Sequence, residues 1–142
     1  MLALAAAGGL LAACSTAVDA TAPAEAGSTA CEAAARAWPD SVAGQERRET
    51  TADTPAVAAW GDPAVIARCG LAPPGPTTQE CLRVDDVDWV VGELSDGVQF
   101  TTFGREPAIE VLVPSDYAPE PLLLPAFGPA ARQLPATGRE CS

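Results

Sequence analysis

Hydrophobic and polar residues alternate in several short segments of the chain, and the alternation has the period of two that is typical of half-buried β-strands. Between two of these segments, Ser95-Asp96-Gly97 has the composition of a hairpin turn. A more polar segment, 47–52, is consistent with an edge strand. The alternating segments are 64–69, 87–91, 98–102 and 109–113. Together they predict a small, mostly antiparallel sheet.

Two other segments have helical character. Thr29 and Glu32 have the spacing of a capping box, and the Ala-rich residues 31–37 that follow end before Pro39. A second short helix is expected over 125–134, with apolar residues at helical spacing. The sequence therefore predicts one α+β domain over residues 29–142, with one or two short helices packed on one face of the sheet and two disulfides.

The N-terminus has the features of an export signal. Residues 1–13 are an apolar stretch of signal-peptide length, too short to span a bilayer. The stretch ends in Leu11-Ala12-Ala13-Cys14, which looks like a bacterial lipobox. We expect cleavage before Cys14 and attachment of acyl chains such as palmitate to this cysteine. No basic residue precedes the apolar stretch, which favours a true start upstream of Met1. Ordinary cleavage, which would release a soluble protein, is the alternative.

Residues 14–28 are predicted to connect this anchor to the domain. Apart from Cys14 they are small and polar, without hydrophobic periodicity. A segment of this composition buries too little apolar surface to offset its conformational entropy, so a flexible tether is expected.

Four cysteines remain after Cys14. An even number in an exported chain predicts two disulfides, for which three connectivities are possible. Cys69 and Cys81 flank a Pro/Gly-rich loop that can fold back on itself, so this pair is preferred, which leaves Cys31 with Cys141. The cysteines lack the close spacing of zinc ligands, so no metal is expected.

The charge balance limits the possible partners and chemistry. The net charge is −11, which disfavours binding to nucleic acid, and the chain has no Lys and no His. A histidine-dependent nucleophile is therefore excluded, and no cofactor is expected. The acidic group around Asp85, Asp86 and Asp88 lacks EF-hand spacing, and Asp88 is predicted to face water.

Leu134–Gly138 spells a sortase pentapeptide, but only four residues follow it, so a structural role is favoured.

Several blocks of residues carry a family resemblance. They are Trp60-Gly61-Asp62-Pro63, Arg68-Cys69-Gly70, Val87-Asp88-Trp89 and the segments 100–105 and 109–117. With these the chain resembles actinobacterial lipoproteins that carry domain of unknown function 3515, from about Cys31 to the C-terminus. The resemblance implies an exported, membrane-attached protein and lends no activity. A composition rich in Ala, Gly, Pro and Arg also points to an actinobacterial source.

Two groups of residues are candidate sites. Trp60, Asp62, Arg68 and Arg105 could bind a carboxylate or an aromatic ligand, since arginine forms paired hydrogen bonds and stacks on rings. The alternative is that Trp60 fills the core and the charged residues serve turns and local ion pairs. Glu106 and Glu110 could act as an acid–base pair on glycan, although two exposed glutamates on a strand are the more common explanation.

The expected function is that of a non-catalytic binding or scaffolding module of the cell envelope. It is held at the outer face of the cytoplasmic membrane by Cys14 and engages an envelope protein or a cell-wall component. The alternatives are an accessory enzyme that acts on envelope glycan, and a small-ligand binder near Trp60 and Arg105.

Overall fold

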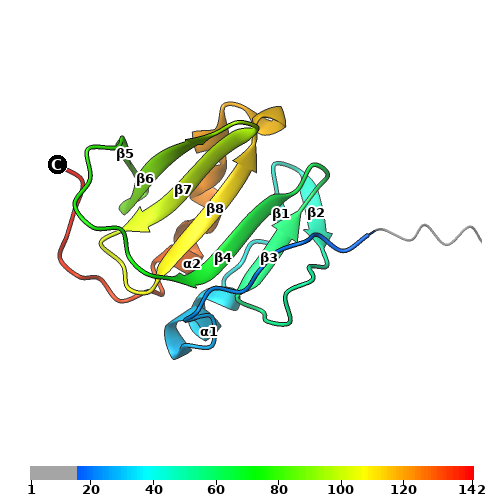
Figure 1. Cartoon of the computed structure of the whole chain (residues 1–142), viewed down its shortest axis with the longest axis horizontal. Helices are drawn as coiled ribbons and strands as arrows, with labels where there is room; N and C mark the ends of the chain where they lie inside the picture. Colours follow the sequence, from blue (N-terminus) through cyan, green and yellow to red (C-terminus); the bar gives the residue numbers. More distant parts are fainter. Residues whose placement is uncertain (1–15) are drawn as a thin grey trace, which may run out of the picture.

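The alternating segments of the chain are strands of one eight-stranded antiparallel sheet in the computed structural model, which describes residues 16–142 (Figure 1). The strand order across the sheet is β1-β2-β3-β4-β8-β7-β6-β5. The strands are β1 Ser41–Val42, β2 Gln45–Arg48, β3 Val57–Trp60, β4 Val65–Leu71, β5 Cys81–Val84, β6 Val87–Leu94, β7 Gly97–Phe103 and β8 Ala108–Pro114. The predicted signal peptide and Cys14 lie outside the described residues.

One face of the sheet is covered by helical segments and forms the core. These segments are α1 Thr29–Ala35, the 3₁₀ turns η1 Ser115–Tyr117 and η2 Glu120–Phe127, and α2 Gly128–Ala131. In Figure 1, α2 lies behind the sheet. Every second residue of the central strands points into this core, as the period-two pattern predicts; the members of β4 and β8 that do so are Val65, Ala67, Cys69, Ile109, Val111 and Val113. The predicted α+β fold with two helices and two disulfides is confirmed.

The first helix begins one residue earlier than its capping box predicts. Ser28, and not Thr29, is the N-cap, and its Oγ accepts a hydrogen bond from the Cys31 N–H at 3.1 Å. A side-chain oxygen at this position satisfies one of the unpaired N–H groups of the first turn. Cys31 is thereby held in the first turn of α1, with its side chain buried against β4.

The disulfides join Cys31 to Cys69 and Cys81 to Cys141, so the preferred connectivity was wrong. The Pro/Gly-rich loop between Cys69 and Cys81 does not turn back on itself. It crosses from β4 to β5, which are separated in the sheet by β8, β7 and β6. Cys69 also faces the core, whereas Cys81 faces the opposite side of the sheet. The two side chains therefore cannot meet.

The segment 16–28 is packed along the sheet, which contradicts the prediction of a flexible tether. Val18 forms a parallel bridge with Thr50 and is only 9% exposed. Further along, the Glu25 N–H donates to the Gly70 carbonyl at 3.0 Å. Gly70 has φ +117, and a Cβ at this position would lie 2.5 Å from the Glu25 carbonyl carbon. Backbone hydrogen bonds and a glycine that permits close approach hold this polar segment, and neither depends on hydrophobic periodicity.

Candidate functional site

The sheet face opposite the helices carries a partly buried ion pair at its centre. We call this face the open face; its central members are Ile66, Arg68, Gln99, Thr101, Glu110 and Leu112. Arg68 on β4 donates through Nη2 and Nε to one carboxylate oxygen of Glu110 on β8, at 2.7 and 3.0 Å. The exposed fractions of the two side chains are 23% and 6%. Arg68 is therefore partly accessible to water, and Glu110 is almost fully shielded from it.

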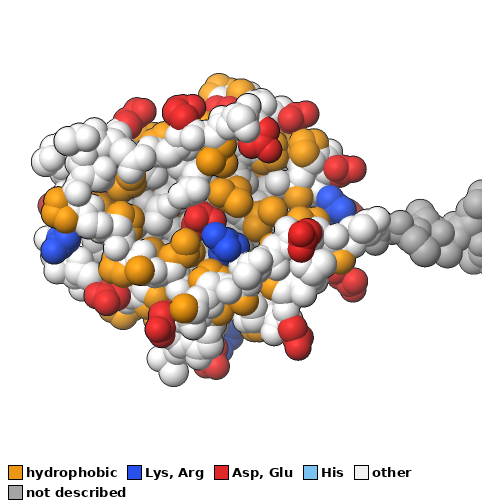
Figure 2. Space-filling view, viewed as in Figure 1, with side chains coloured by type: hydrophobic (Ala, Val, Ile, Leu, Met, Phe, Trp, Pro, Cys, Tyr) orange, Lys and Arg blue, Asp and Glu red, His pale blue; other side chains and the backbone are white. Residues whose placement is uncertain are grey.

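Strand register explains why these two charges meet. Because Ala67 and Cys69 point into the core, Arg68 between them must point to the open face. Arg68 is directly opposite Glu110 in the β4–β8 ladder. Cross-strand neighbours on one face lie within reach of each other's side chains. Figure 2 shows basic and acidic side chains next to each other near the middle of this face, among hydrophobic ones.

Arg68 is also joined to the N-terminal segment. Its Nη1 donates to the Thr21 carbonyl at 3.0 Å, so one guanidinium connects β4, β8 and the segment that crosses the sheet. Arginine suits this position, because its planar donors can serve a carboxylate and a carbonyl at the same time.

Trp60 is part of the core and is not available to a ligand. It is 0% exposed, and its indole N–H donates to the Pro39 carbonyl at 3.0 Å. Its ring packs edge-to-face against Trp38 and Phe127, at centroid distances of 6.4 and 5.5 Å. These contacts are typical of aromatic side chains that fill a core.

The structure does not bring the four predicted ligand-binding residues together. Asp62 is exposed in the turn that follows β3. Arg105 follows β7 at the opposite end of the sheet, where its Nη1 donates to the Leu134 carbonyl at 2.9 Å. Of the proposed acid–base pair, Glu106 is exposed before β8 begins, while Glu110 is held by Arg68. Only Arg68 and Glu110, one from each predicted group, are in contact.

A second group of charges lies between β5, β6 and the C-terminal tail, and it corrects the prediction that Asp88 faces water. Asp88 is 5% exposed. Its two carboxylate oxygens accept hydrogen bonds from Arg83 at 2.7 and 3.2 Å, and one of them accepts the Cys141 N–H at 2.8 Å. Arg83 also pairs with Glu140 at 3.3 Å. The C-terminal tail, held here by Cys141, is what covers Asp88.

This arrangement sets the charge state of Asp88. Burial raises the pKa of its carboxyl group, but the hydrogen bonds from Arg83 and Cys141, with the positive charges of Arg83 and Arg105, lower it by more. The pKa therefore lies below its ordinary value, and Asp88 is ionised at neutral pH.

We expect Asp88 to contribute to acid sensitivity. A carboxyl group with a lowered folded-state pKa stabilises the fold above its unfolded pKa of about 4, and the contribution is lost as the pH falls through the folded value. The unfolding free energy of the parent should therefore be higher than that of the Asp88→Asn variant at pH 7. The difference between the two values should become smaller below about pH 4. Urea unfolding between pH 7 and 3 measures this gap. Asp86→Asn, at an exposed position in the adjacent turn, is the control. A gap that does not change with pH would refute the assignment.

This cluster depends on the β5–β6 hairpin, which is not among the predicted elements. Val84 pairs with Val87, and the two residues between them, Asp85 and Asp86, have φ values of 48° and 65°. Two-residue hairpin turns require such values, which Asp tolerates. Apolar residues on either side of Asp85-Asp86 were the available signal, and the register that follows places Arg83 opposite Asp88.

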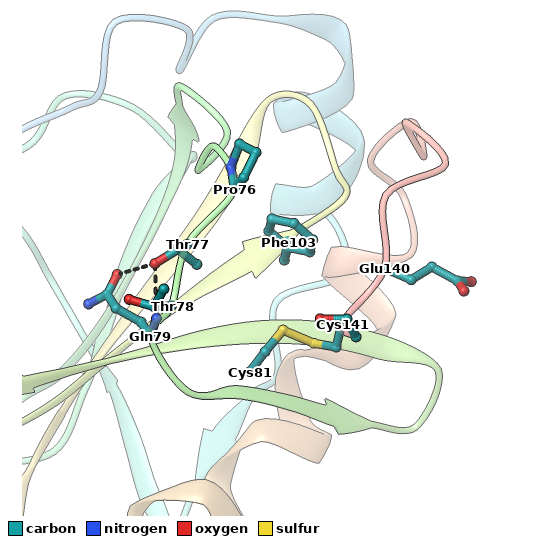
Figure 3. Close-up of a pocket in the computed structure, with 9 residues that line it drawn as sticks. Pro76, Thr77, Thr78, Gln79, Cys81, Phe103, Glu140 and Cys141 are labelled. Carbon is teal, nitrogen blue, oxygen red and sulfur yellow. Dashed lines mark hydrogen bonds between the residues drawn. A yellow bond between two sulfur atoms is a disulfide. The ribbon is translucent and has the colours of Figure 1, made fainter.

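A hollow of about 390 Å³ lies beside the partly buried Cys81–Cys141 disulfide, and we call it the tail hollow (Figure 3). It is lined by residues 76–79 of the Pro/Gly-rich loop, Cys81, Phe103 and the tail residues 140–142. Figure 3 shows the Cys81–Cys141 bridge below the ring of Phe103, with Glu140 directed away. Thr77 and Gln79 are joined by hydrogen bonds within the loop. The lining offers hydroxyl, amide and apolar contacts.

The sortase pentapeptide is built into the fold. Leu134 is 2% exposed. The Pro135 carbonyl accepts the Glu106 N–H at 3.1 Å, and the Thr137 N–H donates to the Gly104 carbonyl at 2.9 Å. α2 ends at Ala131, earlier than the predicted helix, and Gly138 turns with φ +87. The structural role predicted for this segment agrees with these contacts.

Among residues 16–142, no group of three or more His, Cys, Asp or Glu side chains is placed to hold a metal ion. The same residues contain no helix that is long and apolar enough to cross a membrane.

The fold and its sites define an α+β domain that is built on a single antiparallel sheet and held by two disulfides. The chain belongs to the family described as "Protein of unknown function (DUF3515)", whose model matches residues 2–136. No curated protein and no solved structure matches the chain. The family description names no activity.

Proposed function

We propose that the protein is an actinobacterial envelope lipoprotein, anchored by acylated Cys14 to the outer face of the cytoplasmic membrane, and that its domain is a non-catalytic binding or scaffolding module. The observation that carries this proposal is the succession of an apolar stretch, the lipobox-like residues 11–14 and a domain with two disulfides. Disulfides persist in oxidising compartments outside the cytoplasm. Two acyl chains on one cysteine provide stable membrane attachment.

The open face supports binding rather than catalysis. Glu110, one of the two carboxylates considered for acid–base chemistry, is engaged by two nitrogens of Arg68. Around this pair lie the partly exposed apolar side chains of Ile66 and Leu112. A charged centre within an apolar surround resembles the surfaces that proteins use for specific contacts. An envelope protein or a cell-wall component is the partner that we propose for it.

The anchor is tested with a Cys14→Ser variant. In a host that processes lipoproteins, the parent should be recovered from membranes with the mass of the chain from Cys14 plus its acyl groups. The Ser variant lacks the thiol that accepts the lipid, so it should lose the acyl mass and the membrane fraction. Intact-mass spectrometry and fractionation measure both. A mature parent chain without added mass would overturn the lipoprotein assignment.

The binding role is tested by photo-crosslinking in cells, with a photoreactive residue in place of Gln99 on the open face. Gln133, exposed after α2 on the helix-covered side, is the matched control position. We expect one defined adduct from position 99 that is absent from position 133. The same adducts from both positions, or none from position 99, would contradict a binding role for the open face.

A further inference from the structure

The first described residues are tied to β2. Arg48 donates Nη2 to the Thr16 carbonyl and Nη1 to the Gly61 carbonyl, both at 2.8 Å. Two residues further on, the Val18 N–H donates to the Glu49 carbonyl at 2.8 Å, and its carbonyl accepts the Thr51 N–H at 2.9 Å. A backbone paired in this way has a fixed position relative to the sheet. The chain therefore leaves the domain at the β2 side.

This attachment leaves little chain between the domain and Cys14. Thr16 is two residues after Cys14. Successive Cα atoms are 3.8 Å apart, so the two Cα atoms can be separated by at most about 8 Å. A spacer of this length is shorter than the domain is wide, and it restricts which side of the domain can turn toward the anchor.

The residues at the end of β2 are balanced in charge, which permits a close approach to phospholipid headgroups. Residues 46–49 read Glu-Arg-Arg-Glu, which are neutral in sum within a chain of net charge −11. Arg47 and Arg48 are the only adjacent basic residues in the sequence, and Arg47 is exposed. The guanidinium of Arg47 suits phosphate, which accepts paired hydrogen bonds from such a group, whereas that of Arg48 already serves the Thr16 and Gly61 carbonyls. The rest of the acidic surface is repelled by anionic headgroups.

We propose that the β1–β2 edge of the domain faces the phospholipid headgroups, and that the β5 edge, with the tail hollow, points away from the membrane. This inference rests on the anchor proposed at Cys14. β2 and β5 are separated by six strand spacings in the sheet order, which corresponds to roughly 29 Å. In Figure 1 the N-terminal segment reaches β2 at one side of the molecule, while β5 and the C-terminus lie at the other. The hollow is thereby presented to the cell wall.

The orientation is measured by energy transfer to vesicles. The chain from Cys14 contains every described residue, and Cys14 is the one cysteine outside the two disulfides. A thiol-reactive phospholipid on Cys14 attaches it to vesicles of zwitterionic and anionic lipid with an acceptor dye on the headgroups. The parent has no Lys, so Ser41→Lys on β1 and Thr78→Lys beside the tail hollow each provide one side-chain amine for a donor dye. The parent chain, treated with the same dye, measures any labelling of the α-amino group.

We expect transfer from position 41 to exceed that from position 78 by about twofold or more, because the two edges lie roughly 29 Å apart. Eight Gly/Ser residues inserted between Ser15 and Thr16 should abolish the difference. Equal transfer from both positions without the insertion, or stronger transfer from position 78, would overturn the orientation. The anchor is attached chemically, so this result does not depend on acylation in cells. Failure of the lipoprotein proposal would appear separately, in the mass of the native protein.

Discussion

Arg68→Ala should lower the unfolding free energy by about 3 kcal/mol, because it leaves the carboxylate of Glu110 buried and unpaired. The side chain of Glu110 is 6% exposed, so water cannot replace the two hydrogen bonds that it loses. The Thr21 carbonyl loses its partner in the same substitution. Urea unfolding, with the slope checked for a change in the transition, gives the free energy.

A double variant separates the effect of the ion pair from the effect of packing at these two positions. Arg68→Met combined with Glu110→Leu replaces both charges with apolar side chains of similar size, and such replacements of a buried pair are often neutral or stabilising. We therefore expect the double variant to unfold close to the parent. If Arg68→Ala were as stable as the parent, the pair would make no net contribution and Glu110 would be able to reach water.

Replacing both Cys31 and Cys69 with Ala should cost about 4 kcal/mol, the chain-entropy value for a cross-link between residues 38 apart. Both side chains are fully buried between α1 and β4, so packing is lost as well. The affected region should be α1 together with residues 16–28, which cross the sheet beside β4. Hydrogen exchange of the amides from Glu25 to Ala35 reports this local loosening.

The matched control removes Cys81 and Cys141, which are 60 residues apart and only partly buried. The stability lost with this cross-link should be similar to that lost with the first one. Faster amide hydrogen exchange, however, should now be confined to the C-terminal tail and Asp88. A non-reducing digest of the parent that contains a peptide with Cys69 joined to Cys81 would contradict the connectivity. So would a Cys31/Cys69 variant whose tail, rather than α1, exchanges faster.

The local period of two was sufficient to predict the central strands and insufficient to predict the strands toward the edges of the sheet. β4, β6, β7 and β8 alternate over five or more residues, and the sequence places all of them within a few positions. β3 is absent from the predicted strands, because Val57–Trp60 is buried throughout and has no polar member that would give an alternating pattern. β5 is four residues long, and short strands carry little periodic signal. Sheet order is not local information, and the error in the disulfides follows from it.

The candidate site was predictable only in part for the same reason. Arg68 and Glu110 were each singled out from the sequence, but as members of different groups, since 42 residues separate them. Their contact depends on β4 pairing with β8. The alternation of Asp88 with Val87 and Trp89 predicted that its side chain faces water. The C-terminal tail, more than fifty residues later in the chain, buries it. Alternation indicates which face a residue occupies and gives no information on what covers that face.

The pairing of residues 16–25 with the sheet also bears on how long the protein would remain on a cell. Proteases cut where the backbone is exposed and unpaired, and the connection between an anchor and its domain is usually such a place. Here Val18 already uses its backbone groups in hydrogen bonds to the loop after β2, and Glu25 uses its N–H in a hydrogen bond to β4. With the anchor proposed at Cys14, shedding of the domain into the medium would first require this segment to detach. Its release would then be governed by the free energy of that local opening.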